Sequence, residues 1–456
     1  MAEIRGKFTF PGGVHPPEGK QISENCAIEA VPTPKQVAIL LSQHLGAPCQ
    51  PLVAKRDKVQ AGQMIGKSES FVSSPVHTPI SGIVKDIALQ SHPVVGRTLA
   101  VLIDANAEGN APQLPAFDKF DPSFSTDPFT VAQICTAVNN AGLVGMGGAG
   151  FPTRVKIEPN PAVPKEILVI NGCECEPFIT CDYRLMMEAS WQVLAGIRLA
   201  AKAAGVEKIR IGIEDNKPLA IGVMNEAIST VKDIDIRIVP VKTKYPQGGE
   251  RQLIRSVLGK TVPTGQIPPT IGVCVLNIAT CAALAEAVLL GKPLTHRVTT
   301  VTGRAIAKPG NYYVPIGMTV QDLLDHCGGL TRQAAKVVMG GPMMGFAVAD
   351  LSTPLTKTSG AITVLTEEDV TKAKYKKQQT PCIRCGRCLT VCPEGLNPTK
   401  IAHAVKCNRM ELAQHYYMSA CMECGACSYV CPANIELTGY IKTGKILVAR
   451  AKKRMA

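Results

Sequence analysis

The chain reads Cys382-Ile-Arg-Cys385-Gly-Arg-Cys388-Leu-Thr-Val-Cys392-Pro393 near its C-terminus, and the same spacing returns as Cys421-Met-Glu-Cys424-Gly-Ala-Cys427-Ser-Tyr-Val-Cys431-Pro432. This C-x₂-C-x₂-C-x₃-C-P run is the one that holds [4Fe–4S] clusters. The short gaps bring three thiolates to one cube, and we expect the fourth cysteine to open a helix and complete the other cube. The predicted ligand sets are Cys382, Cys385, Cys388 with Cys431, and Cys421, Cys424, Cys427 with Cys392.

A structural zinc site is the alternative interpretation of these cysteines. Zinc takes four ligands, and it does not explain a duplicated fourth cysteine followed by proline. We therefore predict a C-terminal α+β ferredoxin domain with two [4Fe–4S] clusters over residues 366–440, a domain that moves single electrons. Such clusters, together with many unpaired thiols among the 18 cysteines, favour a reducing compartment.

The length and the apolar stretches of the chain limit its domain number and its relation to a membrane. At 456 residues the chain is long enough for several domains. The start lacks the apolar region of a secretory signal. The apolar stretch 271–290 is interrupted by polar residues, so we expect a strand and a buried helix rather than a membrane span. The chain is predicted to be soluble or peripheral to a membrane.

The net charge of +13 is concentrated around the cysteine motifs. No nucleic-acid-binding module is recognisable, so we expect no nucleic acid. An anionic membrane surface or an acidic protein is the expected partner, and solvated side chains without a partner are the alternative. The basic residues are Lys372, Lys374, Lys376, Lys377, Arg384 and Arg387, and in a basic tail (441–456) Lys442, Lys445, Arg450, Lys452, Lys453 and Arg454.

Upstream of the cysteines, the pattern predicts a multidomain α/β chain. After an N-terminal extension (1–35), residues 36–104 alternate apolar and polar positions and predict a β module. A low-complexity bridge (about 105–128) leads to residues 129–292, where helical patterns alternate with apolar strands such as 166–170 and 209–213. That alternation is typical of an α/β domain with a mainly parallel sheet. Residues 295–350 predict a short α+β segment, joined by a charged linker to the cysteine-rich domain.

A glycine-rich string precedes the α/β strands: Gly145-Met-Gly147-Gly148-Ala-Gly150-Phe151-Pro-Thr-Arg-Val-Lys156. The upstream segment 130–140 has a helical pattern, so a Rossmann dinucleotide fingerprint, which must follow a strand, is not favoured. Glycines let backbone N–H groups approach a phosphate or a flat ring. Phe151 offers an aromatic face and Lys156 a positive charge. A plain structural glycine loop is the alternative.

At this point the chain resembles a known family, the flavin- and NADH-binding subunit of respiratory complex I. The glycine string is similar to its G-G-A-G-F-P-T segment. Three further matches follow in order: Asn171-Gly-Cys173-Glu174-Cys175-Glu176-Pro177 with N-A-D-E-S-E-P, Tyr245-Pro-Gln-Gly248-Gly249-Glu250 with Y-x-C-G-E-E, and Asn277-Ile-Ala-Thr280 with N-V-E-T.

The order of domains narrows the resemblance to the RnfC family, the C subunits of Rnf complexes. That order is a Gly12-Gly-Val-His15-Pro-Pro17 extension, a lipoyl-like barrel-sandwich module (36–104), a flavin domain, a β-grasp segment of the SLBB type and a two-cluster ferredoxin. No lysine able to carry a swinging prosthetic group is recognisable in the lipoyl-like module. The resemblance implies a peripheral subunit on the cytoplasmic face of the bacterial inner membrane. It implies FMN, NAD(H) and two [4Fe–4S] clusters as cofactors, the other Rnf subunits as partners, and ferredoxin or flavodoxin reached through the complex.

The resemblance also assigns roles to residues of this chain. The glycines would cradle FMN, Phe151 would stack on the dinucleotide, and Lys156 would face phosphates or the reduced flavin. Asn277 and Thr280 would hold the FMN phosphate. The implied cofactor-binding set is Gly145, Gly147, Gly148, Gly150, Phe151, Lys156, Asn171, Glu174, Glu176, Tyr245, Glu250, Asn277 and Thr280; no side chain is assigned as an acid–base catalyst.

Three positions depart from the complex I pattern: Cys173 and Cys175 replace Asp and Ser, and Gly249 replaces the first Glu of G-E-E. With fewer carboxylates, the NADH contacts are less well specified than those of FMN. Cys173, Cys175 and Cys181 are candidates for a third metal site, with buried free thiols as the simpler interpretation. Two other functions are compatible with the sequence: a soluble cobalamin-reductase-like flavin/iron–sulfur protein, or a non-catalytic electron-relay scaffold.

Overall fold

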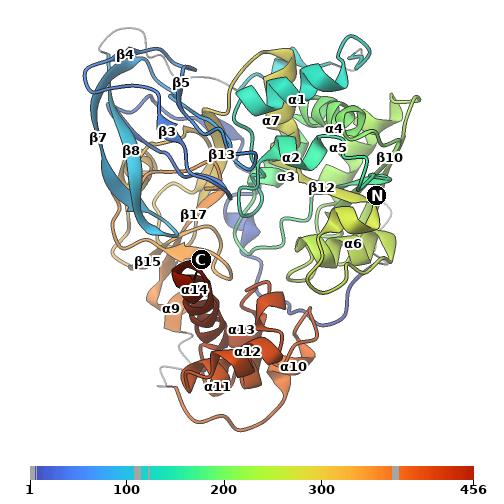
Figure 1. Cartoon of the computed structure of the whole chain (residues 1–456), viewed down its shortest axis with the longest axis vertical. Helices are drawn as coiled ribbons and strands as arrows, with labels where there is room; N and C mark the ends of the chain where they lie inside the picture. Colours follow the sequence, from blue (N-terminus) through green and yellow to red (C-terminus); the bar gives the residue numbers. More distant parts are fainter. Residues whose placement is uncertain (1–5, 7, 107–114, 122–123, 372–378, 456) are drawn as a thin grey trace.

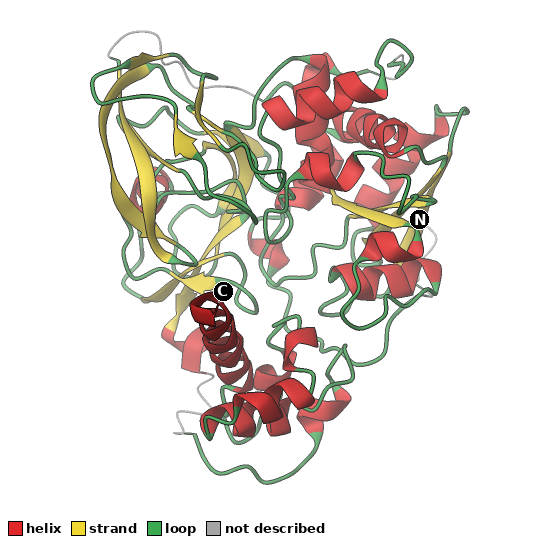
Figure 2. Cartoon of the chain, viewed as in Figure 1, coloured by secondary structure: helices red, strands yellow, loops and turns green. Residues whose placement is uncertain are grey.

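The structure is a computed structural model that describes residues 6, 8–106, 115–121, 124–371 and 379–455. The lysines at 372–377 and the side chains of Lys452, Lys453 and Arg454 lie outside the described part. Two β-rich domains and an α/β domain lie side by side. A small helical domain packs beneath them, as Figures 1 and 2 show. The predicted multidomain α/β architecture is confirmed, in the chain order barrel-sandwich, α/β domain, second β-rich domain and helical cysteine-rich domain.

The α/β domain is built on a four-stranded parallel sheet in the order β11-β10-β9-β12. Side chains alternate along its strands: Leu168 and Ile170 pack into the larger core, whereas Val169 packs against the core on the opposite face. Helices α1, α3, α4, α5 and α7 contribute to the larger core, and α6 covers the other face. Its strands are β9 (Ile167–Asn171), β10 (Lys208–Glu214), β11 (Asp235–Val241) and β12 (Val273–Asn277). Its helices are α1 (Val131–Asn140), α2 (Thr153–Ile157), α3 (Cys181–Glu188), α4 (Ser190–Ala204), α5 (Pro218–Ser229), α6 (Glu250–Leu258) and α7 (Ile278–Leu289).

The segment 105–128, expected to be a low-complexity bridge, packs onto this domain where it is described. Phe117 and Phe124 contact the larger core, and Phe120 is buried with Ala195 and Ala285. Apolar aromatic residues spaced through a polar segment therefore dock it against α4 and α7.

The N-terminal β module is a barrel-sandwich of two antiparallel sheets, β2-β8-β7-β4 and β3-β5-β6. Their inward side chains form one core that includes Val37, Ile39, Ile65 and Ile103. The strands are β2 (Gln36–Leu40), β3 (Gln50–Pro51), β4 (Lys58–Val59), β5 (Met64–Lys67), β6 (Val76–His77), β7 (Gly82–His92) and β8 (Gly96–Ala105).

The second β-rich domain has a six-stranded mixed sheet in the order β1-β14-β13-β17-β15-β16. The sheet takes in two strands from outside residues 295–350, namely β1 from the N-terminal extension and β17 just before the charged linker. Helix α8 (Val320–His326) packs on it through Leu323 and Leu324. The strands are β1 (Ile28–Ala30), β13 (His296–Thr302), β14 (Gly310–Pro315), β15 (Ala334–Met339), β16 (Phe346–Ala347) and β17 (Ala361–Thr366), and the short helix α9 (Glu367–Thr371) follows.

One buried lysine joins three of these domains. Lys357 is 1% exposed, and its Nζ donates hydrogen bonds of 2.6 Å to the backbone carbonyls of Pro75 in the barrel and Gly142 in the α/β domain. Both acceptors lie more than 200 residues away along the chain. A buried ammonium without such acceptors would be costly, so these bonds hold the three domains in a defined arrangement.

The C-terminal domain is a twofold repeat of a cysteine loop, a short helix and a longer helix. The first half contains α10 (Arg387–Thr390) and α11 (Pro398–Lys406), and the second contains α13 (Ala426–Tyr429) and α14 (Leu437–Met455). Helix α12 (Met410–His415) connects them. Ile401, Val405 and Ile441 form the core between the two long helices. The basic tail is thus mostly the C-terminal part of α14, which runs toward the second β-rich domain (Figure 1).

Candidate functional site

The predicted flavin residues gather at the carboxyl edge of the parallel sheet. Asn171 ends β9, Asn277 ends β12, and the two are paired in register. The chain leaves β9 toward β10 and β11, and returns to place β12 on the other side of β9. The strand order therefore reverses between β9 and β12, which is the position where open α/β sheets bind ligands.

The glycine-rich loop lies against this reversal point. Thr280 accepts a 2.9 Å hydrogen bond from Met146 N, and Asn277 caps α7 by accepting from Thr280 N. At Gly147 an added Cβ would lie 2.6 Å from Asn277 Nδ2, so the loop approaches the strand end as only glycine allows. Residues 147–149 are exposed, and their backbone N–H groups donate to no described residue. Such free donors in a glycine-rich turn suit phosphate or ring oxygens, so the residues fit FMN.

Two further predicted residues meet at the same edge. Lys156 Nζ lies 2.9 Å from Glu250 Oε1 and also donates to Val275 O at 3.2 Å. Asn171 Nδ2 donates to Gly248 O at 2.8 Å, which ties the loop before α6 to the end of β9. Lys156 thus places a positive charge beside β12, and Phe151 is half-buried in the adjoining loop.

Three residues of the predicted set make contacts within the protein instead of leaving their polar groups free. The carboxylate of Glu174 accepts from the N–H groups of Asp182 and Tyr183 at the start of α3. That of Glu176 accepts from the N–H groups of Met343 and Met344 in the second β-rich domain. The buried Tyr245 hydroxyl donates to the carbonyl of Cys424 at 2.6 Å. These groups position loops and domains around the carboxyl edge.

Burial raises the pKa of the Glu176 carboxyl to about 7, against the pull of its two N–H donors in the other direction. Between about pH 4.5 and 7, the folded chain therefore holds a proton that the unfolded chain has lost, and the free energy of unfolding falls as pH rises. The expected fall is about 3 kcal/mol.

In Glu176→Gln the contribution of Glu176 to this pH dependence should disappear, because the amide does not titrate, while Asp182, whose pKa burial also raises to about 7, keeps its own contribution. Urea unfolding followed at pH 5 and pH 8 measures it, with the exposed Glu226→Gln on α5 as the matched control. An unchanged pH dependence in Glu176→Gln would assign the titration to another group.

The three cysteines considered for a third metal site lie in separate environments. Cys181 Sγ groups with carboxylate oxygens of Glu174 and Asp182. Cys173 Sγ faces the carbonyl of Gly212 at 3.6 Å, and Cys175 Sγ accepts from Gly248 N at 3.2 Å. Burial raises the pKa of all three thiols, which favours their protonated form.

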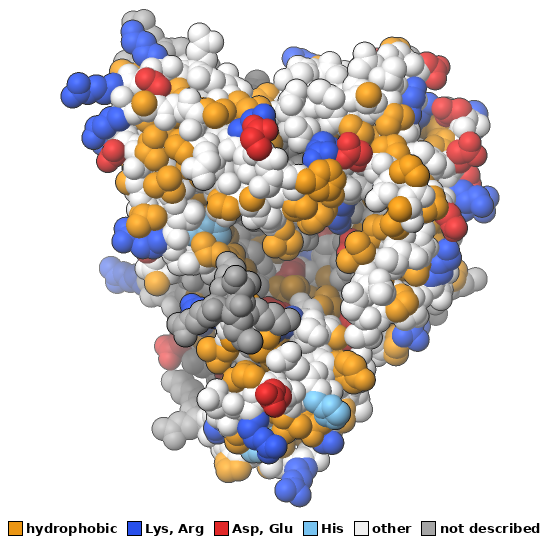
Figure 3. Space-filling model, viewed as in Figure 1, with side chains coloured by type: hydrophobic (Ala, Val, Ile, Leu, Met, Phe, Trp, Pro, Cys, Tyr) orange, Lys and Arg blue, Asp and Glu red, His pale blue; other side chains and the backbone are white. Residues whose placement is uncertain are grey.

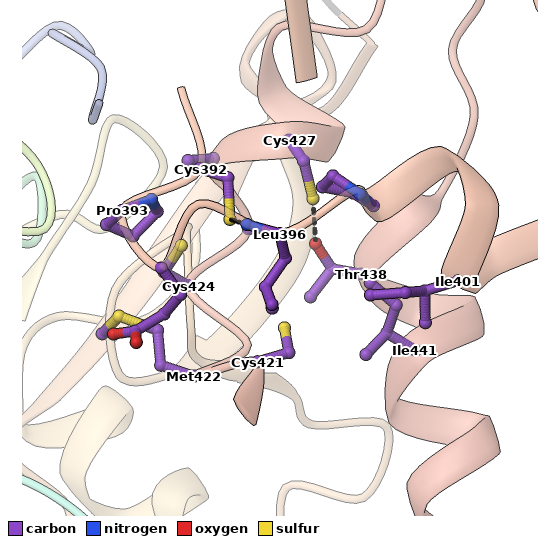
Figure 4. A pocket seen from close by; sticks show the side chains of 14 residues that line it. Cys392, Pro393, Leu396, Ile401, Cys421, Met422, Cys424, Cys427, Thr438 and Ile441 are labelled. Atoms are coloured by element: carbon purple, nitrogen blue, oxygen red, sulfur yellow. Dashed lines mark hydrogen bonds between the residues drawn. The ribbon is translucent and has the colours of Figure 1, made fainter. Parts of the chain in front are cut away.

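Four of the motif cysteines line one cavity in the C-terminal domain (Figure 4). Cys421, Cys424 and Cys427 come from the second motif, and Cys392 reaches the cavity from the first. Burial raises the pKa of Cys421 to about 11 and of Cys424 to about 12, which favours the protonated thiols. Iron binds the thiolate form, so cluster binding would release these protons. Sulfur ligands around one apolar cavity fit a cubane cluster, with the crossed set that the spacing predicts.

The first motif differs from the second in exposure. Cys382 and Cys385 are exposed and Cys388 is buried, whereas Cys424 and Cys427 are both buried. The expectation that the fourth cysteine opens a helix is wrong: Cys392 follows α10 in a turn, and α11 begins only at Pro398. The Cys-Pro pair ends the first short helix and redirects the chain toward the other half.

Sequence reasoning missed several residues at these sites. Asp182 accepts a 2.6 Å hydrogen bond from Asn277 Nδ2, and two threonine hydroxyls lie beside cysteine sulfurs. Thr399 is 2.9 Å from Cys388 Sγ, and Thr438 is 3.5 Å from Cys427 Sγ. Each threonine follows its cysteine by 11 residues, so comparison of the two repeats could have identified the pair.

The two sites are in direct contact. Besides the bond from Tyr245 to Cys424, Gln252 Nε2 donates to Glu394 Oε1 at 2.7 Å. A Cβ added to Gly249 would lie 2.8 Å from Met422 Cε, so the departure from Glu at this position leaves room for the second cysteine loop. The loop of the second motif therefore lies against the loop before α6 and the start of that helix. Figure 3 shows a hollow at the centre of the molecule, between the upper domains and the C-terminal domain.

Comparisons with known proteins match this arrangement domain by domain. In chain order, the RnfC barrel sandwich hybrid domain matches residues 8–108, the Nuo51 FMN-binding domain 138–286, the SLBB domain 298–347 and the 4Fe-4S dicluster domain 369–435. No helix among the described residues has the length and apolar character needed to cross a membrane.

Three curated relatives, all of them C subunits of oxidoreductase complexes, are similar over most of the chain. The one from the proton-translocating ferredoxin:NAD(+) oxidoreductase complex of Clostridium ljungdahlii is 42% identical, covering 86% of this chain and 84% of the relative. The one from the Na(+)-translocating ferredoxin:NAD(+) oxidoreductase complex of Acetobacterium woodii is 40% identical, covering 86% of each. The one from the ion-translocating oxidoreductase complex of Rhodobacter capsulatus is 36% identical, covering 89% of this chain and 76% of the relative.

Proposed function

The chain belongs to the RnfC family, the C subunits of ion-translocating oxidoreductase complexes, and from this premise we propose how it passes electrons between NAD(H) and its partner subunits. FMN and two [4Fe–4S] clusters are the cofactors of its domains. A flavin exchanges electrons in pairs with NADH and singly with iron–sulfur clusters. The proposed order is NAD(H), FMN at the carboxyl edge, the cluster of Cys392, Cys421, Cys424 and Cys427, and then the cluster of Cys382, Cys385, Cys388 and Cys431.

The observation that carries this order is the contact between Tyr245 and the Cys424 carbonyl. It joins the loop before α6, which borders the carboxyl edge, to the ligand loop of the second motif. The first motif lies beyond it and is exposed. One cluster therefore faces the flavin residues and the other faces outward.

The protein's own residues hold and orient the reactants in this proposal. Thr280 and Asn277 fix the glycine loop, so that its free N–H groups present a constant surface to FMN. Lys156 supplies positive charge beside the flavin, and Glu250 pairs with it. Glu174, Glu176 and Tyr245 hold the neighbouring loops and the cluster domain in place.

The proposed setting follows from the family. Other Rnf subunits are its partners. We further propose that the chain binds peripherally on the cytoplasmic face of the inner membrane and exchanges electrons with ferredoxin or flavodoxin through the complex. Supporting this, the relatives are subunits of ion-translocating complexes.

Anaerobic purification followed by an NADH titration tests the function. We expect about eight iron atoms per chain, as two cubane clusters contain, together with non-covalent FMN. NADH should bleach the visible absorption of both. Eight iron atoms without flavin and without a response to NADH would overturn the dehydrogenase proposal and leave a two-cluster relay.

A further inference from the structure

The two halves of the cluster domain share one backbone design. Each residue of the second motif follows its counterpart by 39 positions, as 421 follows 382. Arg384 and Glu423 both have positive φ, 56° and 62°, and so do Gly386 and Gly425, at 75° and 81°. The backbone that presents a surface on one half therefore presents the corresponding surface on the other half.

The second half uses this surface to dock onto the rest of the chain. Met422 packs at Gly249, Cys424 accepts the bond from Tyr245, and a Cβ added to Gly425 would lie 2.8 Å from Met343 O. Glu423 pairs with Lys445 of α14 at 2.8 Å. The ligand loop of the second motif is thus covered by the α/β domain and by the loop before β16.

The corresponding surface of the first half is open. Ile383, the counterpart of Met422, is 66% exposed, and Leu389 is 42% exposed. A Cβ added to Gly386 would meet nothing within 4 Å, in contrast to Gly425. Two apolar side chains therefore flank two exposed cysteines without any cover from the described residues.

The surface of the first half is more basic than that of the second half. Where the second half has Glu423 and Ala426, the first half has Arg384 and Arg387. Both arginines are exposed, and neither forms an ion pair with any residue that the structure describes. A small apolar centre with a basic rim is complementary to an acidic partner surface.

We propose that the open face formed by Ile383, Arg384, Arg387 and Leu389 docks an acidic redox protein and is where electrons cross between this chain and its partner. This inference rests on the proposed function, because it assigns the outward cluster its exchange surface. The partner's own redox group would lie over Cys382 and Cys385, just as the α/β domain lies over the second motif.

The repeat itself supplies the test variant. Arg384→Glu with Arg387→Ala installs the residues that the second half carries on the same backbone, so the loop is expected to fold. A reduced, acidic bacterial ferredoxin serves as the probe of this face in place of the partner subunit: it is mixed with the intact, cofactor-loaded chain, and NAD⁺ reduction is followed over a range of ionic strength. The single variant Arg384→Glu is measured beside the double variant. Its control is Lys58→Glu, a charge reversal at an exposed residue of the barrel.

At low ionic strength we expect the double variant to be about tenfold slower or more, and the difference to vanish at high salt. NADH should still bleach flavin and clusters in both proteins, and this readout tests the proposed function separately. Equal, salt-independent rates for the double variant, the parent and Lys58→Glu would overturn the docking proposal. Wild-type rates in the double variant combined with a slowed Lys58→Glu would place the exchange surface on the barrel instead.

Discussion

Cys392→Ala is expected to remove the cluster beside the flavin residues, although Cys392 belongs to the outward motif. Its sulfur lines the same cavity as Cys421, Cys424 and Cys427. The variant should keep about four iron atoms, in the outward cluster. NADH should then bleach the flavin and leave the remaining cluster oxidised, because the link between them is lost.

Cys431→Ala is the matched variant at the equivalent position of the repeat. It should also keep about four iron atoms, but in the cluster beside the flavin, and NADH should bleach both remaining chromophores. Iron analysis with EPR of the NADH-reduced proteins separates the two variants. The opposite result, with NADH reducing the cluster of Cys392→Ala and not that of Cys431→Ala, would show that each motif supplies all four of its own ligands.

Gly147→Ala is expected to weaken FMN binding about tenfold to a hundredfold and to leave the iron content unchanged. The added methyl group would lie 2.6 Å from Asn277 Nδ2, and Asn277 is held by Thr280 N and Asp182. The loop must therefore move, and overpacking of this kind costs about 1 to 3 kcal/mol. Flavin content after gel filtration and a fluorescence titration with FMN measure the effect.

Gly222→Ala on α5 is the control for this substitution, because its Cβ would meet nothing within 4 Å. It should retain full flavin content. If Gly147→Ala binds FMN as tightly as Gly222→Ala does, the glycine loop is not the flavin cradle.

The elements with local signals were predictable from the sequence. The cysteine spacing implies the crossed set of four that surrounds one cavity, and the alternation of apolar strands with helices predicts the parallel sheet. Asn171 and Asn277 end neighbouring parallel strands, so strand positions alone bring them to one edge.

Features that depend on distant partners were not predictable. Strand β1 pairs with β14 nearly 300 residues later, and nothing in three residues of the N-terminal extension specifies that partner. Motif matching identified Glu174 and Glu176 as polar groups near the flavin, but their bonds to backbone N–H groups of α3 and of the loop before β16 arise only in the folded chain. The role of Tyr245 likewise depends on where the cluster domain docks.

The junction at Lys357 sets an order of events during biosynthesis. The carbonyl of Pro75 is 282 residues ahead of the lysine that binds it. A ribosome adding about 5 to 20 residues per second needs roughly 15 to 60 s to cover that distance. The barrel must therefore persist through this whole interval, and the flavin domain, which is itself synthesised within it, through the shorter remainder, before Lys357 can join the two domains.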